Sequence, residues 1–252
     1  MAISVANMSH TGMVRAVNED YLGYYHIQDM DLLIIADGMG GHRGGKVASK
    51  IAVDSVREYF EIHSSNGLPI ETMIDESLNT ANKMIRDFAN ADPGLFGMGA
   101  TVILLVVKGD KVYFRHLGDC RLYLIRDGNI KRMTKDHTLV QKLLDDGIIT
   151  LAEALFHPER NIVSKALGGR FYLEFDEPIG TLDLRDKDRL LICSDGLFDA
   201  MSDEEILQIA KSQDIQKAVQ QLIEEANRRG GNDNITVQIA LYTGDKDEMS
   251  KV

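Results

Sequence analysis

The chain has 252 residues, 44% of them hydrophobic, which is enough to bury a core as one large domain or two small ones. Its formal net charge of −11 argues against general affinity for nucleic acid or anionic membranes, since both attract basic protein surfaces. No apolar run approaches the length of a membrane span, the start lacks a signal-peptide pattern, and the two cysteines form no metal-type pair. We therefore expect a cytoplasmic protein.

The first predicted element is a strand over residues 2–7, followed by a turn at residues 10–12. Next comes Arg15-Ala16-Val17-Asn18-Glu19-Asp20. Its arginine could bind an anion through two parallel donors, and its two carboxylates could hold a cation. A polar loop with solvated charges explains the same segment, so it does not decide between the two alternatives alone.

A glycine-rich turn follows the next strand. The apolar run Leu32–Ala36 predicts a buried strand, and Asp37-Gly38-Met39-Gly40-Gly41 comes directly after it. A carboxylate at the end of a buried strand, beside accessible backbone carbonyls, suits a hard cation or a phosphate that a cation brings. The alternative is a tight strand-to-helix turn in which Asp37 only caps the next helix.

Helical spacing of apolar residues predicts helices over residues 46–61 and from Pro69 to about residue 91. Four apolar runs then predict an antiparallel meander, with Asp127-Gly128 as a hairpin turn; the runs are residues 99–107, 112–117, 122–126 and 130–133. His116 lies in one of these runs without a second His at metal-binding spacing, so it is expected to be a hydrogen-bonded sheet residue.

Residues 136–167 differ from the rest, because they are polar and partly helical and contain no long apolar strand. They fit either a mobile flap or an ordinary surface insertion. A strand over residues 189–194 then leads to Asp195, and Ser202 with Glu205 forms a capping box that begins a helix. A further helix over residues 215–226 and a strand over residues 235–241 complete the series.

Four carboxylates lie at the edges of apolar strands: Asp37, Asp119, Asp195 and Asp233. Gathered at one edge without a cation, they would repel one another and lose solvation. Oxygen-only ligands favour Mg²⁺ or Mn²⁺, and two such ions about 4 Å apart can share a bridging water or hydroxide that attacks phosphorus. Arg15 would then orient the phosphoryl oxygens and offset their charge.

Five segments resemble, in order, the motifs of the metal-dependent type 2C protein serine/threonine phosphatases. They are Arg15-Ala16-Val17-Asn18-Glu19-Asp20, Asp37-Gly38-Met39-Gly40-Gly41-His42, Gly118-Asp119-Cys120-Arg121, Ser194-Asp195-Gly196-Leu197-Phe198-Asp199 and Gly231-Asn232-Asp233-Asn234-Ile235-Thr236. The short form of the chain is similar to bacterial members. The resemblance implies an α+β fold, a four-layer α-β-β-α sandwich of two antiparallel sheets flanked by helices. It also implies a catalytic domain over residues 1–244, a flap over 136–167 and a polar tail over 245–252.

The resemblance also implies roles for the acidic residues around two core ions. Asp37 would bridge both ions, and Gly38 would offer its backbone carbonyl. Asp195 and Asp233 would complete the ligands of one ion.

The other core ion would be served by Glu19 and Asp20, partly through water. Asp119, together with Asp195, matches the place where bacterial members hold a third, weaker ion. Met39 stands where animal members commonly carry a histidine that is thought to protonate the leaving group. Because methionine cannot donate a proton, the general acid is left open between His42 and a water on the third ion.

The implied substrates are phosphorylated proteins, with a Ser/Thr kinase as the opposing partner, and we expect a monomer that binds neither nucleic acid nor membrane. Two alternatives stay open. One is another two-metal phosphoesterase, such as a nuclease or small-molecule phosphatase, although the acidic charge disfavours a nuclease. The other is a non-catalytic module of the same fold, which would be expected to lack a carboxylate or the arginine, and none is missing.

Overall fold

The computed structural model describes residues 2–41, 43–169, 171–173, 175 and 177–244. The strands form two antiparallel five-stranded sheets, ordered β1-β10-β9-β6-β7 and β2-β3-β4-β5-β8. The strands are β1 (Ala2–His10), β2 (Asp20–Ile27), β3 (Met30–Met39), β4 (Gly99–Lys108), β5 (Lys111–Leu117), β6 (Arg121–Arg126), β7 (Asn129–Arg132), β8 (Gly180–Asp183), β9 (Arg189–Cys193) and β10 (Ile235–Thr243). The helices are α1 (Gly44–His63), α2 (Ile70–Ala91), α3 (Leu139–Asp145), α4 (Leu151–Leu155), α5 (Asp195–Phe198), α6 (Asp203–Ala210) and α7 (Ile215–Arg228), with a short 3-10 turn at Pro93–Leu95.

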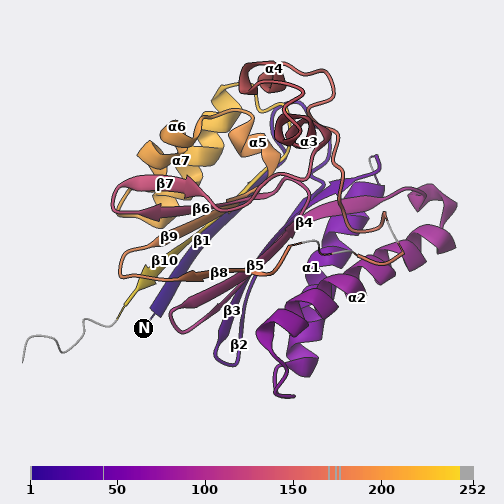
Figure 1. Ribbon diagram of the computed structural model, residues 1–252, viewed down its shortest axis with the longest axis horizontal. Helices are drawn as coiled ribbons and strands as arrows, with labels where there is room; N and C mark the ends of the chain where they lie inside the picture. The colour runs from indigo at the N-terminus through magenta and orange to yellow at the C-terminus, as the bar shows by residue number, and fades with distance from the viewer. Residues whose placement is uncertain (1, 42, 170, 174, 176, 245–252) are drawn as a thin grey trace, which may run out of the picture.

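The two sheets face each other and carry helices on their outer faces, α1 and α2 on one side and α6 and α7 on the other (Figure 1). Three apolar clusters fill the spaces between these layers. The middle cluster lies between the sheets and includes Leu33, Ile35, Ile103, Leu122 and Ile192. The four-layer α-β-β-α sandwich expected from the resemblance is therefore confirmed.

The inner faces of both sheets change from apolar to polar at one end of the sandwich. Side chains alternate along a strand, so Asp37 continues the inner row of Leu33 and Ile35. By the same alternation, Ser194 continues the inner row of β9 and Thr236 that of β10. The strands therefore bring their polar residues to one place, from both sheets.

Several predicted elements differ from the observed ones. The expected meander is divided between the sheets, because β4 and β5 pair in one sheet while β6 and β7 pair in the other. The chain crosses over at residues 118–120. The strand ending in the glycine-rich turn continues through Asp37 to Met39, because these residues still pair with β4. The strands at Asp20–Ile27 and Gly180–Asp183 were not anticipated.

The capping box at Ser202 and Glu205 is present, and Pro69 precedes α2 as expected. His116 is a sheet residue whose Nε2 donates to the Lys135 carbonyl at 2.8 Å, as predicted. The tail expected over 245–252 lies outside the described residues. Within the described residues, every helix is too short or too polar to serve as a membrane span.

Candidate active site

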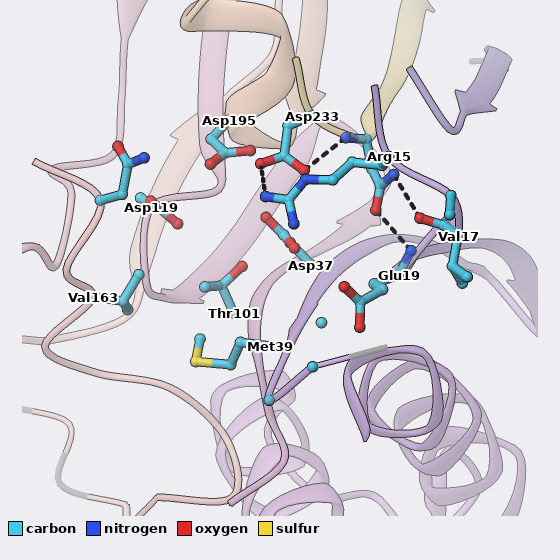
Figure 2. A pocket seen from close by; sticks show the side chains of 16 residues that line it. Arg15, Val17, Glu19, Asp37, Met39, Thr101, Asp119, Val163, Asp195 and Asp233 are labelled. Carbon is cyan, nitrogen blue, oxygen red and sulfur yellow. Dashed lines mark hydrogen bonds and ion pairs between the residues drawn. The ribbon is translucent and has the colours of Figure 1, made fainter. Parts of the chain in front are cut away.

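A cleft of about 380 Å³ opens at the polar end of the sandwich. Seven of the eight residues expected from the sequence line it: Arg15, Glu19, Asp37, Gly38, Asp119, Asp195 and Asp233. Figure 2 shows their side chains around one space, with carboxylates contributed by segments far apart in the chain. Asp20 does not line the cleft.

Asp37 lies at the centre of the polar end. It is the register partner of Asp20 on β2 and of Thr101 on β4. Burial raises its pKa well above the ordinary range, and the negative charges of Asp20 and Asp195 raise it further. A carboxylate in this position is costly to ionise unless a cation lies beside it.

Asp195 and Asp119 lie on connections that leave the sheets. Asp195 begins the short helix α5 after β9, and Asp119 lies in the crossover between β5 and β6. Burial raises the pKa of Asp195 well above its usual value, and the Asp119 and Asp233 charges act in the same direction. Burial likewise raises the pKa of Asp119 to about 6. The cleft therefore concentrates negative charge in poorly solvated surroundings.

Asp20 lies behind the cleft wall and joins the two sheets. Its Oδ2 accepts hydrogen bonds from Ser194 at 2.8 Å and from Thr236 at 2.6 Å. Burial raises the pKa of Asp20 to about 6, although these two hydroxyls oppose the shift. The sequence analysis missed both hydroxyls; the available signal was their place inside the quoted motifs next to Asp195 and Asp233.

Arg15 lies among the acidic residues, on the loop between β1 and β2. Its Nη2 donates to Asp233 Oδ2 at 2.7 Å (Figure 2), and about half of its side chain is exposed. This hydrogen bond is the main reason that the pKa of Arg15 is raised. The exposed part of the guanidinium leaves room for an anion to approach, as a two-pronged donor requires.

Asn234 is a third residue whose role was not predicted from the sequence. Its Oδ1 accepts the Glu19 backbone N–H at 2.7 Å, and its Nδ2 donates to the Thr11 and Val17 carbonyls at 2.9 and 3.0 Å. Asn234 itself is buried. One side chain therefore fixes the loop that carries Arg15 and Glu19 against the turn before β10 that carries Asp233. The Asn-Asp-Asn motif contained the signal, but only its aspartate was assigned a role.

Gly38 is required by close packing. A Cβ atom there would lie 2.1 Å from the Gly45 carbonyl oxygen, and one on Gly45 would lie 2.5 Å from Glu19 Oε1. The two glycines let the end of β3 and the start of α1 approach the Glu19 side chain. The glycine-rich turn therefore serves a close approach of backbone to the cleft.

The segment expected to be a flap forms part of the cleft wall through Asn161 and Val163. Val163 pairs with Thr138 in an isolated bridge that joins the two ends of this segment. Arg160 donates to Asp199 Oδ2 at 3.1 Å, which connects the segment to the residue after α5. The segment thus contains α3 and α4 and borders the acidic cleft.

The donor set fits a hard divalent cation. Three acidic residues each have a buried carboxylate oxygen without a hydrogen-bond partner among the described residues: Glu19 Oε1, Asp20 Oδ1 and Asp195 Oδ1. Oxygen atoms of this kind are the ligands that Mg²⁺ and Mn²⁺ prefer. Within the described part of the chain, no three His, Cys, Asp or Glu side chains lie close enough to form a ready metal group.

One structural observation bears on the general acid. Met39 lines the cleft and has no proton to donate (Figure 2). The alternative residue, His42, lies outside the described residues.

The chain is similar in sequence and in structure to known proteins. A family model described as Protein phosphatase 2C matches residues 10–238. Serine/threonine protein phosphatase PstP of Mycobacterium tuberculosis is 38% identical over 242 residues, which are 95% of this chain and 45% of that protein. This chain thus spans about half the length of that relative. Serine/threonine phosphatase stp of Listeria welshimeri is 36% identical over 232 residues, 90% of each protein. The crystal structure of the PstP catalytic domain in complex with two manganese ions has a TM-score of 0.82 and 35% identity, covering 96% of this chain and 99% of that one.

Proposed function

Because this chain belongs to the protein phosphatase 2C family, we propose that it is a metal-dependent phosphatase that hydrolyses phosphoserine and phosphothreonine on proteins. The observation that carries the proposal is the cleft itself, where buried oxygens of Glu19 and Asp195 without a hydrogen-bond partner in the described part of the chain lie near a half-exposed arginine. This arrangement matches the needs of a cation and of a phosphate monoester at the same place.

The proposed ligands of the core ions are Asp37, Asp195, Asp233 and Glu19 with the Gly38 carbonyl, and Asp20 supports them from behind the cleft wall. When bound, Mn²⁺ or Mg²⁺ supplies activation of water and neutralises charge on the phosphoryl group. The chain's contribution is to hold these oxygens in place and to keep the buried charges close together, which is unfavourable unless a cation is present.

We assign Asp119 to a third, weaker site together with Asp195. Both residues line the cleft, and the charge of Asp119 is among the causes that raise the pKa of Asp195, which supports this assignment.

Arg15 is proposed to bind the phosphoryl group. Its planar guanidinium can donate two parallel hydrogen bonds to phosphate oxygens and offset the charge that develops on them. In the structure one of its nitrogens is held by Asp233. When Asp233 is engaged with a cation, its negative charge is shared, and Arg15 is correspondingly easier for a phosphate to recruit.

The proposed setting is a cytoplasmic monomer whose substrates are phosphorylated by a Ser/Thr kinase, with residues 1–244 as the catalytic domain. A nuclease is disfavoured, because the net charge is −11 and the cleft contains only one basic side chain among its described lining residues.

Turnover of a phosphothreonine peptide tests the proposal. We expect phosphate release with Mn²⁺, loss of release with excess chelator, and recovery when Mn²⁺ is restored. A phosphotyrosine peptide and a single-stranded oligonucleotide serve as comparison substrates. Full activity in metal-free protein, or a preference for the oligonucleotide, would overturn the proposed function.

A further inference from the structure

His137 lies just outside the acidic cleft and contacts the crossover loop that carries Asp119. Its backbone N–H donates to the Gly118 carbonyl at 2.8 Å, and its ring Nδ1 accepts the Gly118 backbone N–H at 3.2 Å. One residue, His137, thus forms hydrogen bonds with both backbone polar groups of Gly118. Asp119 is the next residue in the chain.

The opposite side of Gly118 is also fixed. Gly118 has φ +99°, and a Cβ there would lie 2.4 Å from the Thr101 side chain. Thr101 lines the cleft beside Asp119 (Figure 2). With Thr101 on one side and His137 on the other, the loop has little freedom to move, so the direction of the Asp119 carboxylate depends on both contacts.

The imidazole of His137 is itself held in one orientation. It stacks on His116, with ring centroids 4.4 Å apart and planes 6° from parallel. His116 is fixed in turn by its hydrogen bond to the Lys135 carbonyl at 2.8 Å. Because Gly118 N–H is a donor, His137 Nδ1 must carry a lone pair there, and its ring proton lies on Nε2.

His137 also anchors the flap segment. Its carbonyl accepts the Ser164 N–H at 2.8 Å, and the following residue, Thr138, pairs with Val163 and caps α3. The same residue therefore joins the Asp119 loop to both ends of the segment that forms part of the cleft wall.

We propose that His137 is a positioning residue for Asp119, acting through Gly118, and that its acceptor at Nδ1 sets the affinity of the weaker cation site. This inference rests on the proposed function, because it takes Asp119 as a ligand of that ion. Residues that orient metal ligands from behind typically contribute about 10- to 100-fold in metal affinity or activity. The contacts of His137 with the Asp119 loop are made at Gly118, so the proposed influence on Asp119 runs through that residue.

The test compares four variants of the full chain. His137→Ala removes the acceptor, and His137→Asn keeps one, because its amide oxygen takes nearly the place of Nδ1. Asp119→Asn serves as the benchmark for loss of the weaker ion. Val53→Ala, in the buried face of α1, is a control for stability loss away from the cleft.

Mn²⁺ binding is measured by isothermal titration calorimetry, and turnover of p-nitrophenyl phosphate is measured over a range of Mn²⁺ concentrations. We expect His137→Ala to weaken the last ion to bind by about tenfold and to raise the Mn²⁺ needed for half-maximal kcat by the same factor, while KM is unchanged. His137→Asn should recover most of this loss, and Val53→Ala should show none.

Two outcomes overturn the inference in distinguishable ways. If Asp119→Asn weakens the last ion but His137→Ala does not, or if His137→Asn is no better than His137→Ala, then His137 does not position Asp119 and the proposed function stands. If Asp119→Asn also leaves all ions bound with unchanged affinity, the assignment of Asp119 to a metal site fails together with the inference.

Discussion

We expect Asp20→Asn to stabilise the metal-free protein near pH 7.5. Asp20 is buried, and burial is the largest reason that its pKa lies at about 6, with the Asp233 charge acting in the same direction. The asparagine oxygen can still accept from Ser194 and Thr236, but the side chain never carries a charge. The substitution therefore keeps the contacts between the sheets and removes the cost of ionisation.

The size of the effect follows from the pKa. A rise from 3.8 to about 6 corresponds to about 3 kcal/mol of unfavourable ionisation in the folded state. The folded protein holds this proton more tightly than the unfolded chain does, so stability decreases as pH rises from about 4 to 6. Above that range the cost is fully present. For a chain of this size, removing it should raise Tm by about 6–12 °C.

Thermal unfolding of metal-free protein at pH 7.5, 6.0 and 4.5 measures the difference. The gain should be largest at pH 7.5 and should vanish near pH 4, whereas Asp110→Asn on an exposed turn should show no such trend. Added Mn²⁺ should raise Tm less for the variant than for the parent chain, because the variant offers the ions less negative charge. If Asp20→Asn lowers Tm equally at pH 7.5 and 4.5, the charge of Asp20 does not destabilise the folded protein, and the reasoning is refuted.

Asn234→Ala removes three hydrogen bonds to loop backbone. It should lower the free energy of unfolding by about 3 kcal/mol and raise KM for p-nitrophenyl phosphate. The control Leu222→Ala should lower the free energy of unfolding by a similar amount and leave KM unchanged. If KM of Asn234→Ala equals that of the parent chain, Asn234 only stabilises the fold. Arg15→Lys keeps the charge but not the planar fork, so kcat/KM should fall by about tenfold or more; unchanged kinetics with a lower Tm would show a purely structural arginine. Arg160→Ala breaks the ion pair with Asp199. It should slow turnover of a phosphoprotein several-fold, while the rates on a small substrate change much less. An equal loss of rate on both substrates would show that the flap supports the metal site.

The sequence predicted which acidic residues meet in one cleft better than it predicted the path of the chain. Asp37 and Asp195 could be identified because an acidic residue after a buried apolar run is costly without a cation. The division of the meander between sheets could not, because period-two alternation reports which side chains are buried and not which sheet buries them. The crossover depends on Gly118 and its contacts with Thr101 and His137, which are far away in sequence.

The supporting polar residues were missed for a related reason. Asn234 and the hydroxyls of Ser194 and Thr236 act on partners more than 40 residues away in the sequence. No local pattern separates such residues from ordinary turn and strand residues. The ligand roles of the acidic residues stay predictions, to be tested by the titrations described above.

The pairing of β1 with β10 has a consequence for synthesis of the protein. These strands pair along their full length, from Ala2 with Thr243 to His10 with Ile235. During synthesis β1 cannot pair until β10 has left the ribosome, because the other edge of β1 is the free edge of the sheet. The acidic cleft needs Asp233 as well, so a nascent chain holds no complete site until the segment just before β10 has emerged. Such late, long-range pairing is slow and leaves an unpaired edge exposed, which makes the interval before β10 pairs with β1 the period in which this chain is most exposed to aggregation.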